Sequence, residues 1–421
     1  MIKDKKKNLV AGPVAKPELI APAGDPEKLR IAFMYGADAV YASTPKYSMR
    51  TREIGFTDKS LKESIEYAHR LGKRVYLTVN TFPHAGQIED IKKHARKTVK
   101  LGPDAIIVAD PGMLTYIKSI SDIPVHLSTQ ANTTNHLSAE FWRKAGAERI
   151  VLARELSMKD IKLMHENDKV ELEAFVQGAM CMAYSGRCQI SNYLTGRDPN
   201  KGACVQACRF KYRMYEIEEE MRKGEKFQII EDEHGSYILN SKDLCMVEHL
   251  PALIDAGITS FKIEGRLKSV YYVGVVTRAW RKAIDLYFGD PVKYENEKAK
   301  LKKELSKVSN RGFTTGFYFH KPTQNTNNYD TSRAKSEWGF VGIVKKYDKS
   351  ANLATVEAKN YLPKGASLEI VTPDKVIKYK LNKIYHKGAE VDVVHANYII
   401  EIPVSEELPE NSFLRMKLAV K

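Results

Sequence analysis

Four of the five cysteines in this 421-residue chain lie close together in the sequence and are the residues best suited to do chemistry. Cys181 and Cys188 have six residues between them, Cys204 and Cys208 have three, and fifteen residues separate the two pairs. Thiolates bind soft metal ions and iron-sulfur clusters, and four of them from two neighbouring loops can complete one ligand set. The interspersed glycines permit tight turns, and the nearby arginines can offset charge and donate hydrogen bonds to sulfur. The spacing therefore indicates a metal or iron-sulfur site within residues 181–208.

Three other uses of these cysteines have weaker support. A structural zinc site also takes four thiolates, but it favours pairs separated by two to four residues, and only the second pair obeys that spacing. A redox disulfide would need a C-x-x-C motif, and inert burial does not explain why four of five cysteines cluster. Cys245 lies alone in the sequence, and we predict an ordinary buried thiol there.

A repeated pattern of a small-residue turn followed by a short apolar, β-branched run predicts the elements that carry this site. It occurs at 35–42, 102–109, 145–153 and 256–263, and further strands fit Glu18–Ala21, Arg74–Thr78, Val125–Leu127 and Glu171–Phe175. Helical segments that end on glycine precede several of these strands. Eight strands alternating with helices favour an α/β fold of the (β/α)8 barrel type over a doubly wound sheet, which would show G-x-G-x-x-G after its first strand.

The predicted barrel carries a long insertion before its last strand and a second domain after it. We predict a basic flexible tail at 1–16, a catalytic barrel at 17–290 with an insertion at 176–259, a helical and linker segment at 291–334, and a small C-terminal antiparallel β-barrel at 335–421. Within the insertion we predict a helix at Glu216–Lys226 and a hairpin with strands Phe227–Glu231 and Ser236–Leu239. Helices are expected at Val270–Phe288 and, charged and solvated, at Tyr294–Ser309. In a barrel this insertion would cover the C-terminal mouth, where active sites are built.

The charge balance and the apolar runs restrict partners and location. The formal net charge is +15, which attracts polyanions such as nucleic acid or acidic metabolites. No stretch approaches the roughly 18 apolar residues of a membrane span, and the lysines at 3–7 have no apolar signal segment behind them. We therefore expect a cytoplasmic protein that does not bind membranes.

Polar residues follow seven of the predicted strands, at the end where barrel enzymes place their site residues. They are Ser43, Asn80, Asp110, Ser128 with Gln130, Arg154 with Glu155, Gln177, and Glu264 with Arg266. We predict Arg154, Glu155, Glu264 and Arg266 as catalytic, because arginine binds carboxylates bidentately and a desolvated glutamate can act as general acid or base. The alternative is two structural ion pairs across the barrel mouth. Asp110 is either a site residue or only a helix cap.

In its cysteine block and in several other segments the chain resembles the collagenase-like peptidase family U-32. The resemblance is carried by Phe175–Cys188, Ser191–Leu194, Arg197–Arg209, Glu231–Leu244, Phe261–Arg266 and Glu18–Gly24. These segments point to the branch that includes the prephenate-dependent tRNA uridine hydroxylase. The resemblance implies oxygen-independent hydroxylation of the wobble uridine at C5, with prephenate as a hydroxyl source and the tRNA anticodon loop as partner.

The resemblance also assigns a cofactor and its ligands. It implies a 4Fe-4S cluster held by Cys181, Cys188, Cys204 and Cys208, with Cys245 as no ligand. Prephenate is a small dicarboxylate, which suits Arg154 and Arg266. One departure is Gln177, where the family often has histidine, so this position cannot be an acid or base here.

Two other functions stay open from the residues alone. A peptidase is the historical assignment of the family, but the chain has no H-E-x-x-H and no G-x-S-x-G. A non-catalytic RNA-binding protein with a structural zinc is the other reading.

Overall fold

Eight parallel strands close into a barrel in the computed structural model of the chain. The structure describes residues 15–48, 55–181, 183–195, 197–198, 204–209, 241–320 and 336–418, and two short strand pairs between 217 and 236. The barrel strands are β1 (Glu18–Ala23), β2 (Ala39–Ser43), β3 (Arg74–Val79), β4 (Ala105–Val108), β5 (Val125–Leu127), β6 (Arg149–Val151), β7 (Glu171–Ala179) and β13 (Ser260–Ile263). Each pairs with the next, and β13 pairs with both β7 and β1. The predicted (β/α)8 barrel is confirmed.

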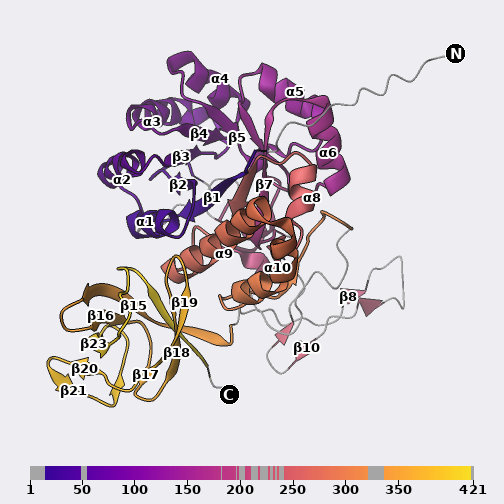
Figure 1. Ribbon diagram of the computed structural model, residues 1–421. Helices are drawn as coiled ribbons and strands as arrows, with labels where there is room; N and C mark the ends of the chain where they lie inside the picture. Colours follow the sequence, from indigo (N-terminus) through magenta and orange to yellow (C-terminus); the bar gives the residue numbers. More distant parts are fainter. Residues whose placement is uncertain are drawn as a thin grey trace.

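Helices alternate with these strands and surround the barrel (Figure 1). They are α1 (Pro26–Met34), α2 (Asp58–Arg70), α3 (Ile88–Lys100), α4 (Pro111–Ile120), α5 (His136–Lys144), α6 (Met158–Asn167), α8 (Leu250–Asp255) and α9 (Val270–Gly289). Short 3-10 turns lie at η1 (Ala85–Gln87) and η2 (Thr129–Ala131). The layer between strands and helices is filled by aliphatic and aromatic side chains, which makes it the main hydrophobic core.

Local sequence explains where several of these helices begin and end. Asp25 and Asp110 cap α1 and α4 with their side chains, each followed by proline at the first helical position. After α1 the chain turns at Gly36, with φ +104°, and a Cβ there would lie 2.5 Å from Cγ of Arg281. A side chain at position 36 would therefore be excluded by both conformation and packing.

The insertion between β7 and β13 contains α7 (Ile190–Thr195), η4 (Ala207–Arg209) and β12 (Asp243–Cys245). Strand β12 extends the sheet antiparallel to β7 and pairs on its other side with β14 (Phe313–Thr314). The predicted helix at Glu216–Lys226 is wrong at its ends, because β8 (Ile217–Glu218) pairs with β9 (Lys226–Phe227). The predicted hairpin is present, but its paired strands lie closer to the turn than predicted. Strand β10 (Glu231–Asp232) pairs antiparallel with β11 (Gly235–Ser236). The remainder of both predictions lies outside the described residues.

After the barrel, α10 (Pro291–Leu305) packs against α9. It was expected to be solvated, yet Tyr294 is fully buried and its hydroxyl donates to the carbonyl of Val247 over 2.8 Å. Residues 321–334 of the predicted helical and linker segment and residues 1–14 of the predicted tail lie outside the described residues. Among the described helices, none is long and apolar enough to cross a membrane.

The C-terminal residues form an eight-stranded antiparallel sheet in the order β19-β18-β24-β15-β16-β23-β20-β21. Its strands are β15 (Trp338–Asp348), β16 (Leu353–Ala358), β18 (Ser367–Val371), β19 (Val376–Lys380), β20 (Tyr385–His386), β21 (Ala389–Glu390), β23 (Ile399–Pro403) and β24 (Phe413–Lys417), with β17 (Leu362–Pro363) and β22 (Val393–Val394) paired separately. An antiparallel sheet therefore lies where the sequence predicts the small C-terminal antiparallel domain.

This C-terminal sheet packs against α1 and α9 of the barrel (Figure 1). The ring of Phe413 stacks on Tyr35 at 5.1 Å, and the Tyr35 hydroxyl contacts the carbonyl oxygens of Val371 and Asn411 at 3.0 Å. The guanidinium of Arg415, fully buried, lies 2.7 Å from Glu304 and 2.6 Å from Glu369. These contacts join the two parts through both apolar packing and buried ion pairs.

Candidate functional site

A pocket opens at the C-terminal ends of the barrel strands and is covered by the cysteine-containing loop. Its lining includes all four clustered cysteines and three of the four predicted catalytic residues, Arg154, Glu264 and Arg266. The space between its walls, together with the open mouth, amounts to about 1040 Å³. Barrel topology therefore brings residues from 41 to 266 to one place.

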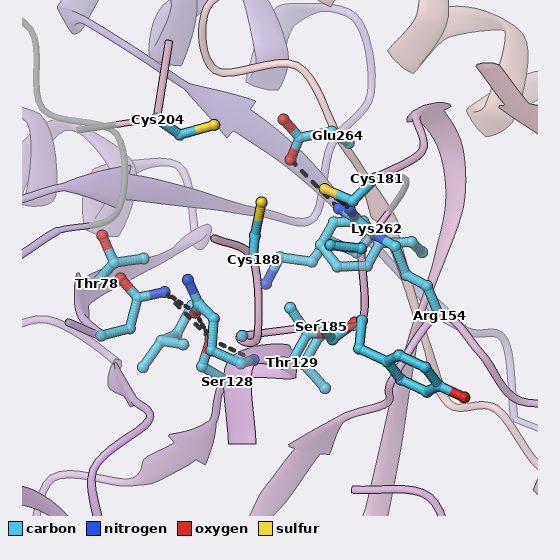
Figure 2. Close-up of a pocket in the computed structure, with 18 of the residues that line it drawn as sticks. Thr78, Ser128, Thr129, Arg154, Cys181, Ser185, Cys188, Cys204, Lys262 and Glu264 are labelled. Carbon is cyan, nitrogen blue, oxygen red and sulfur yellow. Dashed lines mark hydrogen bonds and ion pairs between the residues drawn. The ribbon is translucent and has the colours of Figure 1, made fainter. Parts of the chain in front are cut away.

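The cysteines reach the pocket from two segments of the insertion. Cys181 follows β7 directly, Cys188 precedes α7, and Cys204 and Cys208 lie before and within η4. Figure 2 shows the sulfur atoms of Cys181, Cys188 and Cys204 directed toward the same space. No group of three or more His, Cys, Asp or Glu side chains in the described part of the chain is arranged so that it could hold a metal ion.

Arg154, just beyond β6, joins the cysteines to the acidic group of the pocket. Its Nη1 donates to the sulfur of Cys181 over 3.2 Å, and its Nη2 lies 3.9 Å from Oε2 of Glu264. The guanidinium stacks over the ring of Phe175 at 4.1 Å from the centroid, which fixes its plane. Arg154 is therefore held between a thiol and a carboxylate at the pocket wall.

Glu264 and Arg266 follow β13 on the same wall. The Tyr41 hydroxyl lies 3.3 Å from Oε2 of Glu264 and donates to the carbonyl of Ile263 over 3.0 Å. Arg266 donates from Nη1 to the hydroxyls of Ser43 and Thr78, the latter over 3.1 Å. Both side chains are more than nine-tenths buried, so their charges act in a partly desolvated site.

Glu155 is the predicted catalytic residue that does not line the pocket. Its Oε1 accepts from the backbone N–H of Ser185 over 2.8 Å and its Oε2 accepts from Nδ2 of Asn132 over 3.3 Å. The Ser185 hydroxyl contacts both carboxylate oxygens at 3.2 Å. The structure thus places Glu155 beneath the loop that carries Cys181 and Cys188, where it holds that loop in position.

Three other predicted positions lie away from the pocket lining. Asp110 caps α4 by accepting a hydrogen bond from the N–H of Met113 over 2.9 Å. Of the two roles predicted for Asp110, the structure therefore shows the helix cap. Gln177 is buried and accepts from Nε1 of Trp280 on α9 over 3.3 Å, so its side chain faces the helix layer. Cys245 is also buried, and burial raises its thiol pKa to about 12. The ordinary buried thiol predicted at 245 agrees with this burial.

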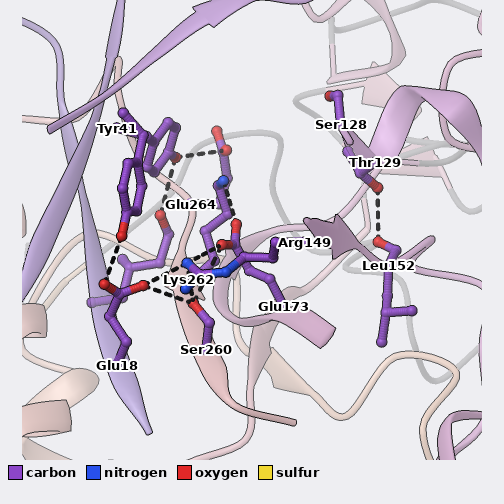
Figure 3. A network of polar contacts seen from close by, with 12 residues as sticks. Glu18, Tyr41, Ser128, Thr129, Arg149, Leu152, Glu173, Ser260, Lys262 and Glu264 are labelled. Atoms are coloured by element: carbon purple, nitrogen blue, oxygen red, sulfur yellow. Dashed lines mark hydrogen bonds and ion pairs between the residues drawn. The ribbon is translucent and has the colours of Figure 1, made fainter. Parts of the chain in front are cut away.

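A charged network inside the barrel was not predicted from the sequence. Lys262 donates to Oε1 of Glu173 over 2.5 Å, and Arg149 lies 3.3 Å from Oε2 of Glu173 and 2.5 Å from Oε2 of Glu18 (Figure 3). Ser260 contacts both glutamates. The signal available in the sequence was the charged residue within each predicted strand, Glu173 in β7 and Lys262 in β13.

Burial and pairing oppose each other in this network. Burial alone would raise the pKa of Glu173, but Lys262 and Arg149 beside it lower it to about 2. Burial lowers the pKa of Lys262, and it lowers the pKa of His126 to about 3 with help from the Arg149 charge. Lys262 also lines the pocket floor, where its ammonium lies 4.5 Å from the centre of the Tyr41 ring. The pocket lining therefore carries three cationic side chains and one carboxylate.

The opposite wall of the pocket is neutral and carries amide and hydroxyl groups. Asn80 Nδ2 donates to Oε1 of Gln130 over 2.6 Å and to the hydroxyl of Ser128 over 3.1 Å. The Ser128 hydroxyl donates to the same Oε1. These residues follow β3 and β5, as the sequence predicted for polar strand ends.

Comparison with known proteins shows which family the chain belongs to. Residues 24–328 match the model of peptidase family U32, and residues 336–415 match the model of the U32 C-terminal domain. The chain belongs to peptidase family U32. The U32 match covers the barrel from the end of β1 onward, including the pocket lining and all four clustered cysteines.

Relatives of this U32 protein carry names of different activities. One from Escherichia coli, named tRNA hydroxylation protein P, is 37% identical over 443 residues and covers 96% of this chain and 97% of its own. Another from Escherichia coli, named as a 23S rRNA 5-hydroxycytidine synthase, is 31% identical and covers 88% of this chain and 55% of its own. A third, from Porphyromonas gingivalis and named collagenase, is 32% identical and covers 93% and 95%.

Proposed function

We propose that this protein is a tRNA-modifying enzyme that hydroxylates C5 of the wobble uridine. The proposal includes a 4Fe-4S cluster on Cys181, Cys188, Cys204 and Cys208 and a small dicarboxylate, prephenate, as hydroxyl source. The observation that carries it is that these cysteines and the charged strand-end residues line one pocket. The names of two relatives, a tRNA hydroxylation protein and an rRNA 5-hydroxycytidine synthase, support hydroxylation of a pyrimidine in RNA.

The chemistry of the donor set fits an iron-sulfur cluster. Four thiols from two segments line one pocket. A 4Fe-4S cluster takes one thiolate at each of its iron corners. Arg154 already donates to the sulfur of Cys181, and hydrogen bonds to ligating sulfur tune such clusters. When bound, the cluster would supply the one-electron chemistry that amino-acid side chains lack.

The charged wall of the pocket fits the small acid. Arg154, Lys262 and Arg266 give the lining more positive than negative charge, and guanidinium groups bind carboxylates through paired hydrogen bonds. Glu264, more than nine-tenths buried, sits beside Arg154 and the Tyr41 hydroxyl, where its carboxyl can hold or release a proton at Oε2. These residues bind and orient the acid, and Glu264 serves as the acid or base.

The pocket mouth fits an unstacked RNA base. Tyr184 lines the pocket yet is 65% exposed, and Tyr193 on α7 is 88% exposed. Exposed aromatic rings beside a pocket can stack on a base that leaves the anticodon loop, whereas rings that shielded a cluster from water would be covered. The net charge of +15 supports phosphate contacts, which would make tRNA affinity fall steeply with salt.

Anaerobic purification and nucleoside analysis test the proposal together. The purified protein should be brown and contain about four iron atoms per chain with equal sulfide. Cys204→Ser should lose this iron, while the matched Cys245→Ser, a buried thiol outside the pocket, should keep it. In a host that lacks its own hydroxylase, mass spectrometry of tRNA nucleosides should detect a 5-hydroxyuridine derivative with the wild-type chain and with Cys245→Ser only.

Other outcomes would overturn parts of the proposal. A colourless protein with stoichiometric zinc that Cys204→Ser abolishes would remove the cluster and favour an RNA-binding protein with a structural metal. Unmodified tRNA together with metal-independent cleavage of a collagen peptide would favour the activity that the third relative is named for.

A further inference from the structure

The neutral wall of the pocket differs in chemistry from the charged wall opposite. Asn80 and Ser128 are more than nine-tenths buried, and with the half-buried Gln130 they present only amide and hydroxyl groups to the pocket. Figure 2 shows Thr78 and Ser128 on one side of Cys188 and Cys181 with Arg154 on the other. Arg266 reaches Thr78 at the edge of this neutral wall over 3.1 Å. A charged co-substrate and a neutral nucleobase would therefore bind side by side, with the base against the amide and hydroxyl groups.

We propose that Asn80, Ser128 and Gln130 form the subsite that reads the target base, and that the Gln130 amide selects a pyrimidine with an oxygen at C4, uracil, over one with an amino group, cytosine. The inference rests on the proposed RNA hydroxylation and adds its base selectivity. Its basis is the direction of the hydrogen bonds on this wall.

Two donors hold one end of the Gln130 amide. Asn80 Nδ2 and the Ser128 hydroxyl both donate to Oε1, so this oxygen is turned into the wall. The Nε2 amino group lies on the other side of the same planar amide and has no hydrogen-bond acceptor among the described residues. A buried Asn–Ser pair thus fixes Gln130 as a hydrogen-bond donor toward a ligand.

A fixed donor distinguishes the two pyrimidines. Uracil presents the O4 acceptor at the position where cytosine presents its N4 amino donor. The Nε2 group of Gln130 can donate to O4, but it would face the N4 amino group donor to donor. A site built to hydrogen-bond one group rejects the analogue that leaves its polar atoms unpaired, which makes the contact selective.

The subsite is also packed against the cysteine loop. Gly186, between Cys181 and Cys188, has φ +72°, and a Cβ there would lie 2.1 Å from the carbonyl oxygen of Gln130. A base held by Gln130 would therefore lie beside the segment that carries two of the four thiols. This places the selected base next to the centre proposed for the chemistry.

Two variants test the direction of the amide. Gln130→Glu keeps the shape but replaces the donor with an acceptor oxygen. Asn80→Asp removes the donor that holds Oε1, so the Gln130 amide should turn its Nε2 toward the new carboxylate and present its oxygen to the ligand. Asp110→Asn is the matched control, because Asp110 caps α4 outside the pocket lining and asparagine caps equally well.

The measurement is the affinity of the full chain for anticodon stem-loop RNA with U or C at the wobble position, followed by fluorescence anisotropy. The wild type and Asp110→Asn should prefer U over C by about tenfold to a hundredfold. Gln130→Glu and Asn80→Asp should each lose or reverse this ratio, mainly by weaker binding of U. In the hydroxylase-deficient host, both should lower 5-hydroxyuridine and raise 5-hydroxycytidine in tRNA.

The outcomes separate this inference from the proposed function. Thermal melting first checks that both variants are folded. If the wild type hydroxylates tRNA and both folded variants keep its ratio of U to C affinity, the subsite is overturned while the proposed function stands. If the wild type binds neither stem-loop and leaves tRNA unmodified, the proposed function fails and the subsite fails with it.

Discussion

Replacing Lys262 with methionine tests how the barrel interior balances its buried charges. The change keeps most of the side-chain volume but removes the ammonium that lies 2.5 Å from Oε1 of Glu173. Glu173 is fully buried and keeps one cation, Arg149, at 3.3 Å. The substitution therefore leaves a buried carboxylate with half of its ionic partners.

The size of the effect follows from the pKa of Glu173. This pKa falls from 4.5 to about 2 in the folded chain, a change of about 2.5 units, which corresponds to about 3 kcal/mol of stability at neutral pH. Removing one partner of a buried ion pair costs about 3–5 kcal/mol. Because Arg149 remains, we expect Lys262→Met to lower the free energy of unfolding by about 3 kcal/mol, the low end of that range.

The pH dependence has a definite sign. The folded pKa of Glu173 lies below the unfolded value, so its stabilising contribution is present above pH 4.5 and is lost as pH falls toward 2. Between pH 5 and pH 3 the wild type should lose about 2 kcal/mol through this group. Lys262→Met should lose less, because without the lysine burial raises the folded pKa, so the two stabilities should converge at low pH.

Equilibrium urea unfolding at pH 7 and pH 3 measures both quantities. Trp280, buried on α9 and 6.0 Å from the ring of Phe261, reports on the barrel through its fluorescence. The double variant Glu173→Gln with Lys262→Met removes both charges and should recover part of the loss, since the uncompensated carboxylate is gone. A Lys262→Met chain with the wild-type urea midpoint at pH 7, or a difference as large at pH 3 as at pH 7, would refute the reasoning.

Three further substitutions have defined outcomes. Gly186→Ala should lower the melting temperature strongly and weaken RNA binding, because its Cβ would lie 2.1 Å from the Gln130 carbonyl oxygen. The control Gly72→Ala, with φ +66° and no atom within 4 Å of its Cβ, should cost only about 1 kcal/mol. Equal losses of stability in the two variants would contradict the packing argument. Arg415→Met leaves Lys307, 3.3 Å from Glu304 and 2.8 Å from Glu369, as the cation of these two carboxylates and should cost about 3 kcal/mol, with calorimetry showing the C-terminal sheet unfolding before the barrel; one unchanged transition would argue against this interface. Asp110→Ala should cost about 1 kcal/mol in urea unfolding and Asp110→Asn almost nothing, and a large loss of tRNA hydroxylation in Asp110→Asn would return this residue to the site.

Much of the fold could be predicted because its signals are local. The short apolar strands and the glycines at helix ends are set by neighbouring residues, and the eight predicted barrel strands match β1 to β7 and β13. The helix predicted at Glu216–Lys226 was wrong where Ile217 and Lys226 lie in paired strands. A charged stretch can satisfy its backbone hydrogen bonds along a helix or across a strand pair, and only the tertiary contacts choose.

The site divides in the same way. The sequence by itself determined which residues could reach the barrel mouth, because cysteine spacing and strand ends are properties of the chain order. It could not determine which way a strand residue faces, since a parallel strand buried on both sides has no polar face to mark. The pairing of β7 and β13, with its register shift between Lys262 and Ile263, decided that. It set Lys262 against Glu173, 89 positions apart, and Gln177 against Trp280 outside the barrel.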